Sequence, residues 1–421
     1  MKRIKNNMKK TSINDLYQIS KENKILSNRD GIVTLKNGEE ILLNDFIDDN
    51  PQVIRPNYNN SILNIVSSIK KYYGFDSNIS SHPKIDEILA EKEYKHISLM
   101  LLDGMGSHIM KDSLDDDSFL YKHKVCDLSS LFPPTTACVI PAIQSGLLPI
   151  LSGWVGWENY FEEINKHVVM FKNTDYYTEE KLDFNVREKL PYNNFYDEFN
   201  VFSFELGPKF HPSKCQSFDE MCYKFLEETH LTKETFSYLY WDEPDYSLHE
   251  FGSGSLEVKK VLKDIDQHVS NLYDKMEKDT LMIITADHGH IDVKNIYFSN
   301  FKDLNQLLER IPSNEGRCAF FKVKPFKKKK FEKLFNLYFG DYFTLINKDD
   351  FLKEGYLGDS ESYNKRLDSF IGDYVGIAKK NYTFVFNPNL SCDNDADFVM
   401  RSHHAGMTAN ELVTPLIILA K

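Results

Sequence analysis

The chain has 421 residues, which is enough for a large hydrophobic core and for two domains. It carries 63 acidic against 51 basic residues, and a formal charge of -12 argues against general nucleic-acid binding through a basic surface. Its six cysteines show no CxxC pair and no regular spacing, so we expect reduced thiols rather than a disulfide framework.

The N-terminus and the hydrophobic runs predict a soluble protein. Residues 1–10 are basic enough to begin a signal peptide, but residues 11–23 contain no continuous apolar run. No segment approaches the ~18 consecutive apolar residues that a membrane span requires. We therefore expect a cytoplasmic protein that does not bind membranes.

The first 60 residues are polar and rich in Asn and Lys. Asn37-Gly38 separates two alternating runs, which predicts a β-hairpin over residues 32–43 with a type I′ turn. Residues 61–73 place isoleucines at helical spacing, which predicts an amphipathic helix on the core. We assign residues 1–85 to an N-terminal extension that ends in this covering helix.

Asp103 directly follows the apolar run of residues 97–102, which predicts a buried strand. Gly104 and Gly106 allow the backbone to turn sharply and to approach a ligand closely. Asp103 is therefore a candidate ligand at a strand end, with capping of the next helix as the alternative.

A helix is expected to begin at Thr135 or Thr136, because Pro133 and Pro134 keep the preceding chain extended. A hydroxyl at a helix start either caps the helix or acts as a nucleophile. In the second role, free backbone N–H groups and the helix dipole would favour a bound phosphate.

Aromatic residues cluster downstream of this helix. Core packing explains them most simply, and stacking against a substrate such as a nucleobase is the alternative. The candidate substrate-binding residues are Trp154, Trp157 and Tyr160.

Two further strand ends carry ligand-type residues. The strand predicted over residues 236–241 precedes Asp245 and His249, which one helical turn would place on the same face. After a long amphipathic helix, the apolar run of residues 281–284 precedes Asp287 and His288. This β-loop-α-β order is the unit of a parallel sheet, so residues 86–300 are assigned to a catalytic α/β core.

Residues 301–395 differ in character, with short β-like pieces and the run Lys327 to Lys330, and we assign them to an inserted cap domain. The lysines are interpreted as a solvated helix face. Residues 396–421 contain His403-His404 and a last apolar strand, which returns to the core.

Ligand-type residues thus recur at strand ends. Three carboxylates and three imidazoles are enough for two divalent metal ions, and mixed nitrogen and oxygen donors suit Zn²⁺, or alternatively Mn²⁺, better than Mg²⁺ or Ca²⁺. We expect anionic substrates to be bound locally through such ions.

The ordered motifs resemble those of the type I phosphodiesterase/nucleotide pyrophosphatase family of the alkaline phosphatase superfamily. That resemblance implies an α/β three-layer sandwich with a mostly parallel central sheet and a smaller α+β cap insertion. The motifs are Leu101-Leu102-Asp103-Gly104-Met105-Gly106, Phe132-Pro133-Pro134-Thr135-Thr136-Ala137, Pro244-Asp245-Tyr246-Ser247-Leu248-His249, Asp287-His288-Gly289, and His404-Ala405-Gly406 with Glu411 and Pro415-Leu416.

The resemblance also implies the roles of single residues. One metal ion would be held by Asp103, Asp287 and His288, with Thr136 beside it as nucleophile and ligand; the other would be held by Asp245, His249 and His404. Thr136 is preferred over Thr135 because the family's nucleophile stands nine residues before a Thr/Ser-Gly pair, here Ser145-Gly146.

Three positions depart from the family pattern: Val139 replaces an Asn, Ser152 a His and Ala405 a Gly. These changes weaken specificity for nucleotide pyrophosphates more than they weaken the metal site. The preferred hypothesis is a two-metal phosphodiesterase that hydrolyses a small phosphodiester or nucleotide. The alternatives are a phosphomonoesterase or phosphosugar mutase on the same scaffold, and a catalytically silent protein that binds metal or nucleotide. The substrate and the oligomeric state stay open.

Overall fold

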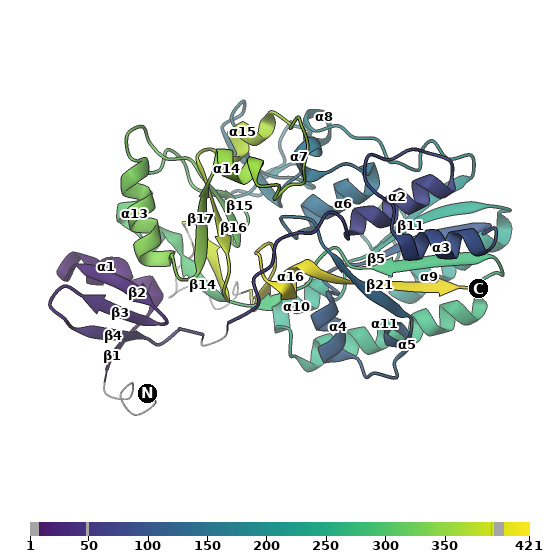
Figure 1. Ribbon diagram of the computed structural model, residues 1–421, viewed down its shortest axis with the longest axis horizontal. Helices are drawn as coiled ribbons and strands as arrows, with labels where there is room; N and C mark the ends of the chain where they lie inside the picture. The colour runs from purple at the N-terminus through teal and green to yellow at the C-terminus, as the bar shows by residue number, and fades with distance from the viewer. Residues whose placement is uncertain (1–7, 48–49, 389, 391–399) are drawn as a thin grey trace.

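The computed structural model describes residues 8–47, 50–388, 390 and 400–421. A small N-terminal sheet lies at one end of the long axis and a six-stranded sheet at the other, with a seven-stranded sheet between them (Figure 1). The boundary predicted between residues 395 and 396, and Cys392, lie outside the described residues.

The six-stranded sheet has the order β10-β11-β5-β12-β21-β6. Its first four strands are mutually parallel, and β21 runs antiparallel to both of its neighbours. The strands are β5 (His96–Leu102), β6 (Lys124–Ser129), β10 (Phe202–Leu206), β11 (Thr235–Trp241), β12 (Thr280–Thr285) and β21 (Val413–Ala420).

Helices cover both faces of this sheet, because successive side chains of a strand point to opposite sides. In β5, Leu99 packs on one face and Met100 on the other. One face is covered by α2 (Ile62–Tyr72), α3 (Pro83–Glu91) and α6 (Thr136–Ser145), the other by α4 (Ser107–Ser113), α9 (Phe218–Leu231) and α11 (Leu256–Lys275). The predicted α/β three-layer arrangement is confirmed.

The seven-stranded sheet is built from two distant parts of the chain and has the order β17-β18-β16-β15-β7-β8-β9. Strands β7 (Glu158–Phe161), β8 (Lys166–Val169) and β9 (Thr174–Asp175) come from the first part. The second part provides β15 (Ser313–Asn314), β16 (Cys318–Phe321), β17 (Phe343–Asn347) and β18 (Tyr374–Ala378). This sheet therefore takes strands from both sides of the division predicted at residue 300.

The N-terminal sheet contains the predicted hairpin, formed by β3 (Ile32–Leu35) and β4 (Glu40–Leu43). The predicted type I′ turn is wrong, because that turn needs positive φ at both central residues and only Gly38 has it. Strand β1 (Lys9–Thr11) pairs with β4, and β2 (Ile25–Arg29) pairs with β3.

This sheet shares a hydrophobic core with α13 (Lys328–Phe339) of the predicted cap. Asn28 crosses the contact: its Nδ2 donates to the carbonyl of Tyr338 at 2.9 Å and its Oδ1 accepts from Tyr342 Oη at 3.1 Å. The exposed lysines at residues 327–330 precede and begin α13, in agreement with the predicted solvated face.

Shorter elements connect these layers. The helices are α1 (Leu16–Glu22), α5 (Phe119–Lys122), α7 (Pro149–Ser152), α8 (Val186–Lys189), α10 (Asp245–Phe251), α12 (Lys302–Asn305), α14 (Lys348–Lys353), α15 (Arg366–Ile371) and α16 (Ala409–Leu412). The short strands are β13 (Ile291–Asp292), β14 (Lys294–Tyr297), β19 (Tyr382–Val385) and β20 (Ser402–His403).

Among the described residues, no helix has the length and hydrophobicity needed to span a bilayer. The five described cysteines are free thiols.

The central strands should carry much of the stability. Leu99 in β5 is fully buried, whereas Leu231 at the end of α9 is 84% exposed. Leu99→Ala is expected to lower the free energy of unfolding by about 3 kcal/mol, because it leaves a cavity in a packed core. Leu231→Ala removes the same atoms from the surface and should change it by less than about 0.5 kcal/mol. Urea titration of both variants measures the difference.

Candidate metal centre

The predicted ligands converge at one edge of the six-stranded sheet, because neighbouring strands end there. Strands β11, β5 and β12 lie side by side and parallel, so Asp245, Asp103 and Asp287 all follow carboxyl ends. The backbone fixes two of them directly: Asp103 N–H donates to the carbonyl of Trp241, and Asp245 N–H donates to that of Asp103.

Two glycines permit this convergence. A Cβ atom on Gly104, whose φ is +72°, would lie 2.9 Å from Asp245 Cα. A Cβ on Gly106 would lie 2.5 Å from Gly289 Cα, next to His288. The glycines noted in the sequence therefore let the segments that carry the ligands pack against each other.

Asp103, Asp287 and His288 form the first ligand group, and all three are buried. His288 Nε2 lies 3.4 Å from Asp103 Oδ1 and 3.3 Å from Asp287 Oδ2. Asp287 Oδ1 accepts hydrogen bonds from the N–H groups of Gly104 and His288, whereas its Oδ2 is buried and has no hydrogen-bond partner among the described residues. One carboxylate oxygen therefore stays free to bind a cation.

Thr136 faces this group from the first residue of α6. Its Oγ1 lies 3.3 Å from Asp103 Oδ2 and 3.3 Å from His288 Nε2. Thr135 is the N-cap residue, and its hydroxyl points elsewhere and donates to Glu315 Oε1 at 2.8 Å. The structure thus brings Thr136, and not Thr135, to the first ligand group.

The two carboxylates repel each other in this buried setting. Burial, followed by the charges of Asp287 and Asp245, raises the pKa of Asp103 well above its ordinary value. Tyr240 Oη donates a short hydrogen bond to Asp103 Oδ2. A divalent cation at this position would neutralise the repulsion.

The second ligand group consists of Asp245, His249 and His404, as predicted, together with His290. Asp245 Oδ1 lies 3.5 Å from His249 Nε2, 3.8 Å from His404 Nε2 and 2.6 Å from His290 Nε2. Burial opposes ionisation of Asp245, but the neighbouring histidines outweigh it and hold the pKa of its carboxyl below the ordinary value.

Each histidine of this group has its Nδ1 within hydrogen-bond distance of a fixed oxygen. The partner of His249 is the carbonyl of Ser402 at 2.9 Å, and that of His404 is the carbonyl of Pro134 at 3.0 Å. His290 Nδ1 lies 3.0 Å from Ser402 Oγ. An Nδ1–H that donates to a carbonyl leaves Nε2 as an acceptor, which is the usual arrangement in metal-binding histidines.

Sequence reasoning gave no role to His290. The feature of the sequence that could have identified it as a ligand is its position two residues after His288, at the same strand end. The ring is fully buried, and burial lowers its pKa to about 4, which leaves it neutral at physiological pH. His403, by contrast, belongs to neither ligand group in the described structure.

The two ligand groups are in contact. The rings of His288 and His404 stack with centroids 3.8 Å apart and planes 18° apart. Each group offers at least three donors of mixed nitrogen and oxygen type, which fits Zn²⁺ or Mn²⁺. The unpartnered oxygen of Asp287 and the neutral imidazoles are further features that fit bound cations.

The structure separates the three aromatic candidates. Trp154 is buried in a hydrophobic cluster, and its indole Nε1 donates to the carbonyl of Leu190, so it packs in the core. Trp157 is linked to the N-cap residue Thr135 through a shared acceptor, because its backbone N–H donates to Glu315 Oε1 at 2.7 Å. Tyr160 donates to Asn165 Oδ1 at the turn of the β7-β8 hairpin.

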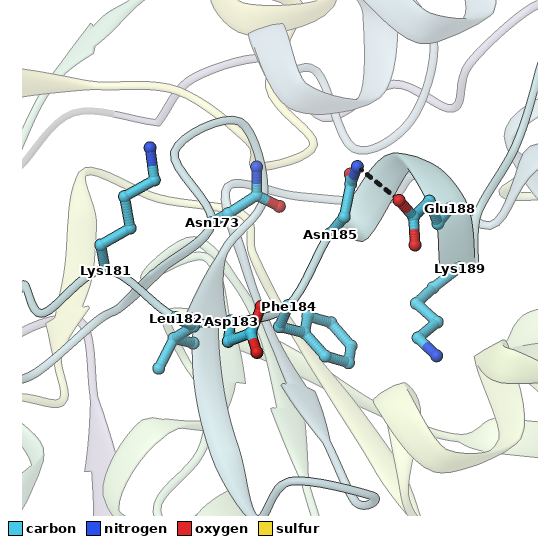
Figure 2. A pocket seen from close by; sticks show the side chains of 8 residues that line it. All are labelled: Asn173, Lys181, Leu182, Asp183, Phe184, Asn185, Glu188 and Lys189. Atoms are coloured by element: carbon cyan, nitrogen blue, oxygen red, sulfur yellow. Dashed lines mark hydrogen bonds between the residues drawn. The ribbon is translucent and has the colours of Figure 1, made fainter.

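A cavity of about 390 Å³ opens beside α8 and is lined by residues of both charges (Figure 2). Asn185 Nδ2 donates to Glu188 Oε1 at the start of α8 (Figure 2). The lining residues are Asn173, Lys181, Leu182, Asp183, Phe184, Asn185, Glu188 and Lys189, and none of them is a predicted site residue.

Curated relatives match a short part of the chain. The bis(5'-adenosyl)-triphosphatase ENPP4 of Bos taurus is 39% identical over 61 residues, which are 13% of this chain and 14% of that protein. The Homo sapiens protein of the same name is also 39% identical over 61 residues. The chain thus matches about one seventh of the length of these relatives.

Solved structures match most of the chain and show the fold. Human ectonucleotide pyrophosphatase/phosphodiesterase 5 superposes with a TM-score of 0.55 at 18% identity, over 78% of this chain and 88% of that one. Phosphonoacetate hydrolase from Sinorhizobium meliloti, in complex with phosphonoacetate, superposes with a TM-score of 0.57 at 13% identity, over 78% and 90%.

A family model gives the assignment. It matches residues 99–405, which include every predicted metal ligand and Thr136. The chain therefore belongs to the type I phosphodiesterase/nucleotide pyrophosphatase family.

Proposed function

We propose that this protein hydrolyses a small phosphodiester or nucleotide at a two-metal centre, with Thr136 as the nucleophile. The observation that carries the proposal is the position of the Thr136 hydroxyl, 3.3 Å from Asp103 Oδ2 and 3.3 Å from His288 Nε2. A hydroxyl held against a carboxylate and an imidazole at a helix start is placed for attack on phosphorus.

The ligand groups would hold one divalent ion each. Asp103, Asp287, His288 and Thr136 would hold the first, and Asp245, His249 and His404 the second, with His290 against Asp245. When bound, these ions would lower the pKa of the threonine hydroxyl and neutralise the charge of the phosphoryl group.

The chain's own residues perform the remaining steps. The N–H groups of Thr136 and Ala137 have no protein acceptor in the described part of the chain, so they are available to a phosphoryl oxygen. Thr136 Oγ1 attacks phosphorus in line and forms a phosphothreonine as the bond to the leaving oxygen breaks. Water then cleaves the phosphothreonine and restores the hydroxyl.

Two solved neighbours bind small phosphorus compounds, a phosphate ester in one and a phosphonate in the other, which supports a small phosphoryl compound as the substrate. One is murine ectonucleotide pyrophosphatase/phosphodiesterase 5, solved in complex with AMP, at a TM-score of 0.53 and 16% identity. The other is the hydrolase solved with phosphonoacetate. Their chemistry supports a phosphoryl compound with a small organic substituent.

Thr136→Ala is expected to lower turnover of bis-p-nitrophenyl phosphate by at least about 10³-fold. The hydroxyl of the preceding residue, Thr135, cannot replace it, because that hydroxyl donates to Glu315 and does not face the first ligand group. The bound metal content, measured by atomic emission, should stay within a factor of two of the original. Full activity in this variant would remove Thr136 from the mechanism.

Metal binding is tested separately from turnover. Two equivalents of Zn²⁺ should bind the chelator-treated protein and raise its melting temperature, since ligand at 100 times Kd stabilises by about 2.7 kcal/mol. Asp287→Asn and Asp245→Asn should each lose one equivalent. Asp115→Asn, at a side chain that is 76% exposed, is the matched control. Equal metal content in all four proteins would contradict the assignment.

The same preparation distinguishes the diester from the monoester hypothesis. The metal-loaded protein should cleave bis-p-nitrophenyl phosphate with a higher kcat/KM than p-nitrophenyl phosphate. The opposite ratio would favour the phosphomonoesterase or mutase alternative.

A further inference from the structure

The turn between β15 and β16 binds segments that lie next to both ligand groups. This turn, residues 315–317, joins two strands of the seven-stranded sheet, but its two charged side chains bind Thr135 and Glu411, which lie outside that sheet. Glu315 is 6% exposed and Arg317 is fully buried. Charged groups are rarely buried unless a specific partner fixes them.

Glu315 holds the segment that carries the nucleophile. Its Oε1 accepts from Thr135 Oγ1 at 2.8 Å and from the N–H of Trp157 at 2.7 Å. Thr135 is the N-cap of α6, and its carbonyl accepts the first hydrogen bonds of that helix. Glu315 therefore fixes the residue directly before Thr136.

Arg317 holds the loop that carries His404. Its guanidinium forms a two-point ion pair with Glu411, at 2.6 and 2.8 Å, inside the protein. Glu411 Oε1 also accepts from the N–H of Gly406, two residues after His404, at 2.6 Å. The main-chain carbonyl of Glu411 accepts from Gly289 N–H at 2.9 Å, directly after His288.

The turn itself has little freedom. The main chain of Gly316 and Arg317 bonds Phe384 and Ala378, and a Cβ on Gly316 would lie 2.4 Å from the carbonyl oxygen of Phe384. Arg317 Nη1 also donates to the carbonyls of Lys380 and Tyr382. Because the turn is held in place by these hydrogen bonds, the groups that its side chains bind are held in place as well.

Resting on the function proposed above, we propose that Glu315 and Arg317 are positioning residues that fix Thr136 relative to the two ligand groups. Glu315 acts through Thr135 on the nucleophile, and Arg317 acts through Glu411 on the loops of His404 and His288. We call these two chains of contacts the Glu315 arm and the Arg317 arm. They make separate predictions, since the Glu315 arm should affect turnover and the Arg317 arm should affect metal affinity.

The Glu315 arm is tested on the full-length, metal-loaded protein. Glu315→Ala should lower kcat for bis-p-nitrophenyl phosphate by about tenfold or more, with KM and chelator-measured zinc affinity within twofold. Glu315→Gln keeps an oxygen acceptor and should recover most of that loss. Thr135→Val removes the shared hydrogen bond but keeps the one from Trp157 N–H, so it should reproduce most of the kcat loss of Glu315→Ala, and the double variant should lose little more than Glu315→Ala alone.

Hydrogen exchange gives a measurement that needs no turnover. Amides of residues 132–145 should exchange faster in Glu315→Ala and return toward the original rate in Glu315→Gln, while residues 256–275 of α11 stay unchanged. Unchanged exchange and unchanged kcat in Glu315→Ala, with only a lower melting temperature, would overturn this arm in favour of a purely structural role.

The Arg317 arm uses a mild substitution, because deleting a buried charge leaves Glu411 unpaired and threatens folding. Arg317→Lys keeps the charge and loses the two-point geometry. Zinc affinity, measured by chelator competition, should fall about tenfold, as for other partners behind metal ligands. An affinity within twofold of the original in the folded variant would overturn it. If the original protein cleaves no phosphoester, the proposed function fails, while exchange and zinc affinity still decide the positioning roles.

Discussion

Mutual repulsion among Asp103, Asp245 and Asp287 is the constraint around which this molecule is arranged. Parallel strands deliver all three to one buried edge, where a low dielectric strengthens the repulsion. The surroundings of the carboxylates differ between the two ligand groups. Several histidines around Asp245 hold the pKa of its carboxyl below the ordinary value, whereas Asp103, which has Asp287 and only one imidazole beside it in its ligand group, has a raised pKa. A bound cation would therefore relieve more electrostatic repulsion in the first ligand group than in the second.

The close packing of this edge explains where glycine and histidine occur. Gly104, Gly106 and Gly289 allow three loops to approach within van der Waals contact. Burial lowers the pKa of His290 and His404, which favours the neutral form of these two rings. Their Nδ1 atoms meet fixed oxygens, so the same loops that bring the ligands together also orient them.

Local signals were enough to predict much of the site. Asp287-His288 follows an apolar run, and Asp245 and His249 are one helical turn apart, so each pair could be recognised within a few residues of sequence. Resemblance then separated Thr136 from Thr135, which local chemistry had left open, and in the structure it is the Thr136 hydroxyl that lies beside Asp103 while that of Thr135 donates to Glu315.

The rest depends on contacts between distant residues. Arg317 and Glu411 are 94 positions apart, and neither belongs to a strand-end pattern. The membership of β7 to β9 in a sheet with residues 313–378 follows from pairing across about 150 residues, which no local periodicity encodes. Even the hairpin at Gly38 was predicted with the wrong turn, because Asn37 keeps a negative φ that its residue type does not dictate.

The place of β21 in the central sheet has a consequence for the order of folding. It lies between β12 and β6, and β6 is an edge strand of that sheet in the described part of the chain. Residues 124–129 are therefore synthesised almost 300 residues before the strand that pairs with them. The N-terminal sheet likewise precedes Tyr338, its partner across the shared core, by about 310 residues. The six-stranded sheet and the N-terminal sheet thus both need contacts with residues that are synthesised much later. Folding can therefore be completed only after the whole span from β1 to β21 has been synthesised.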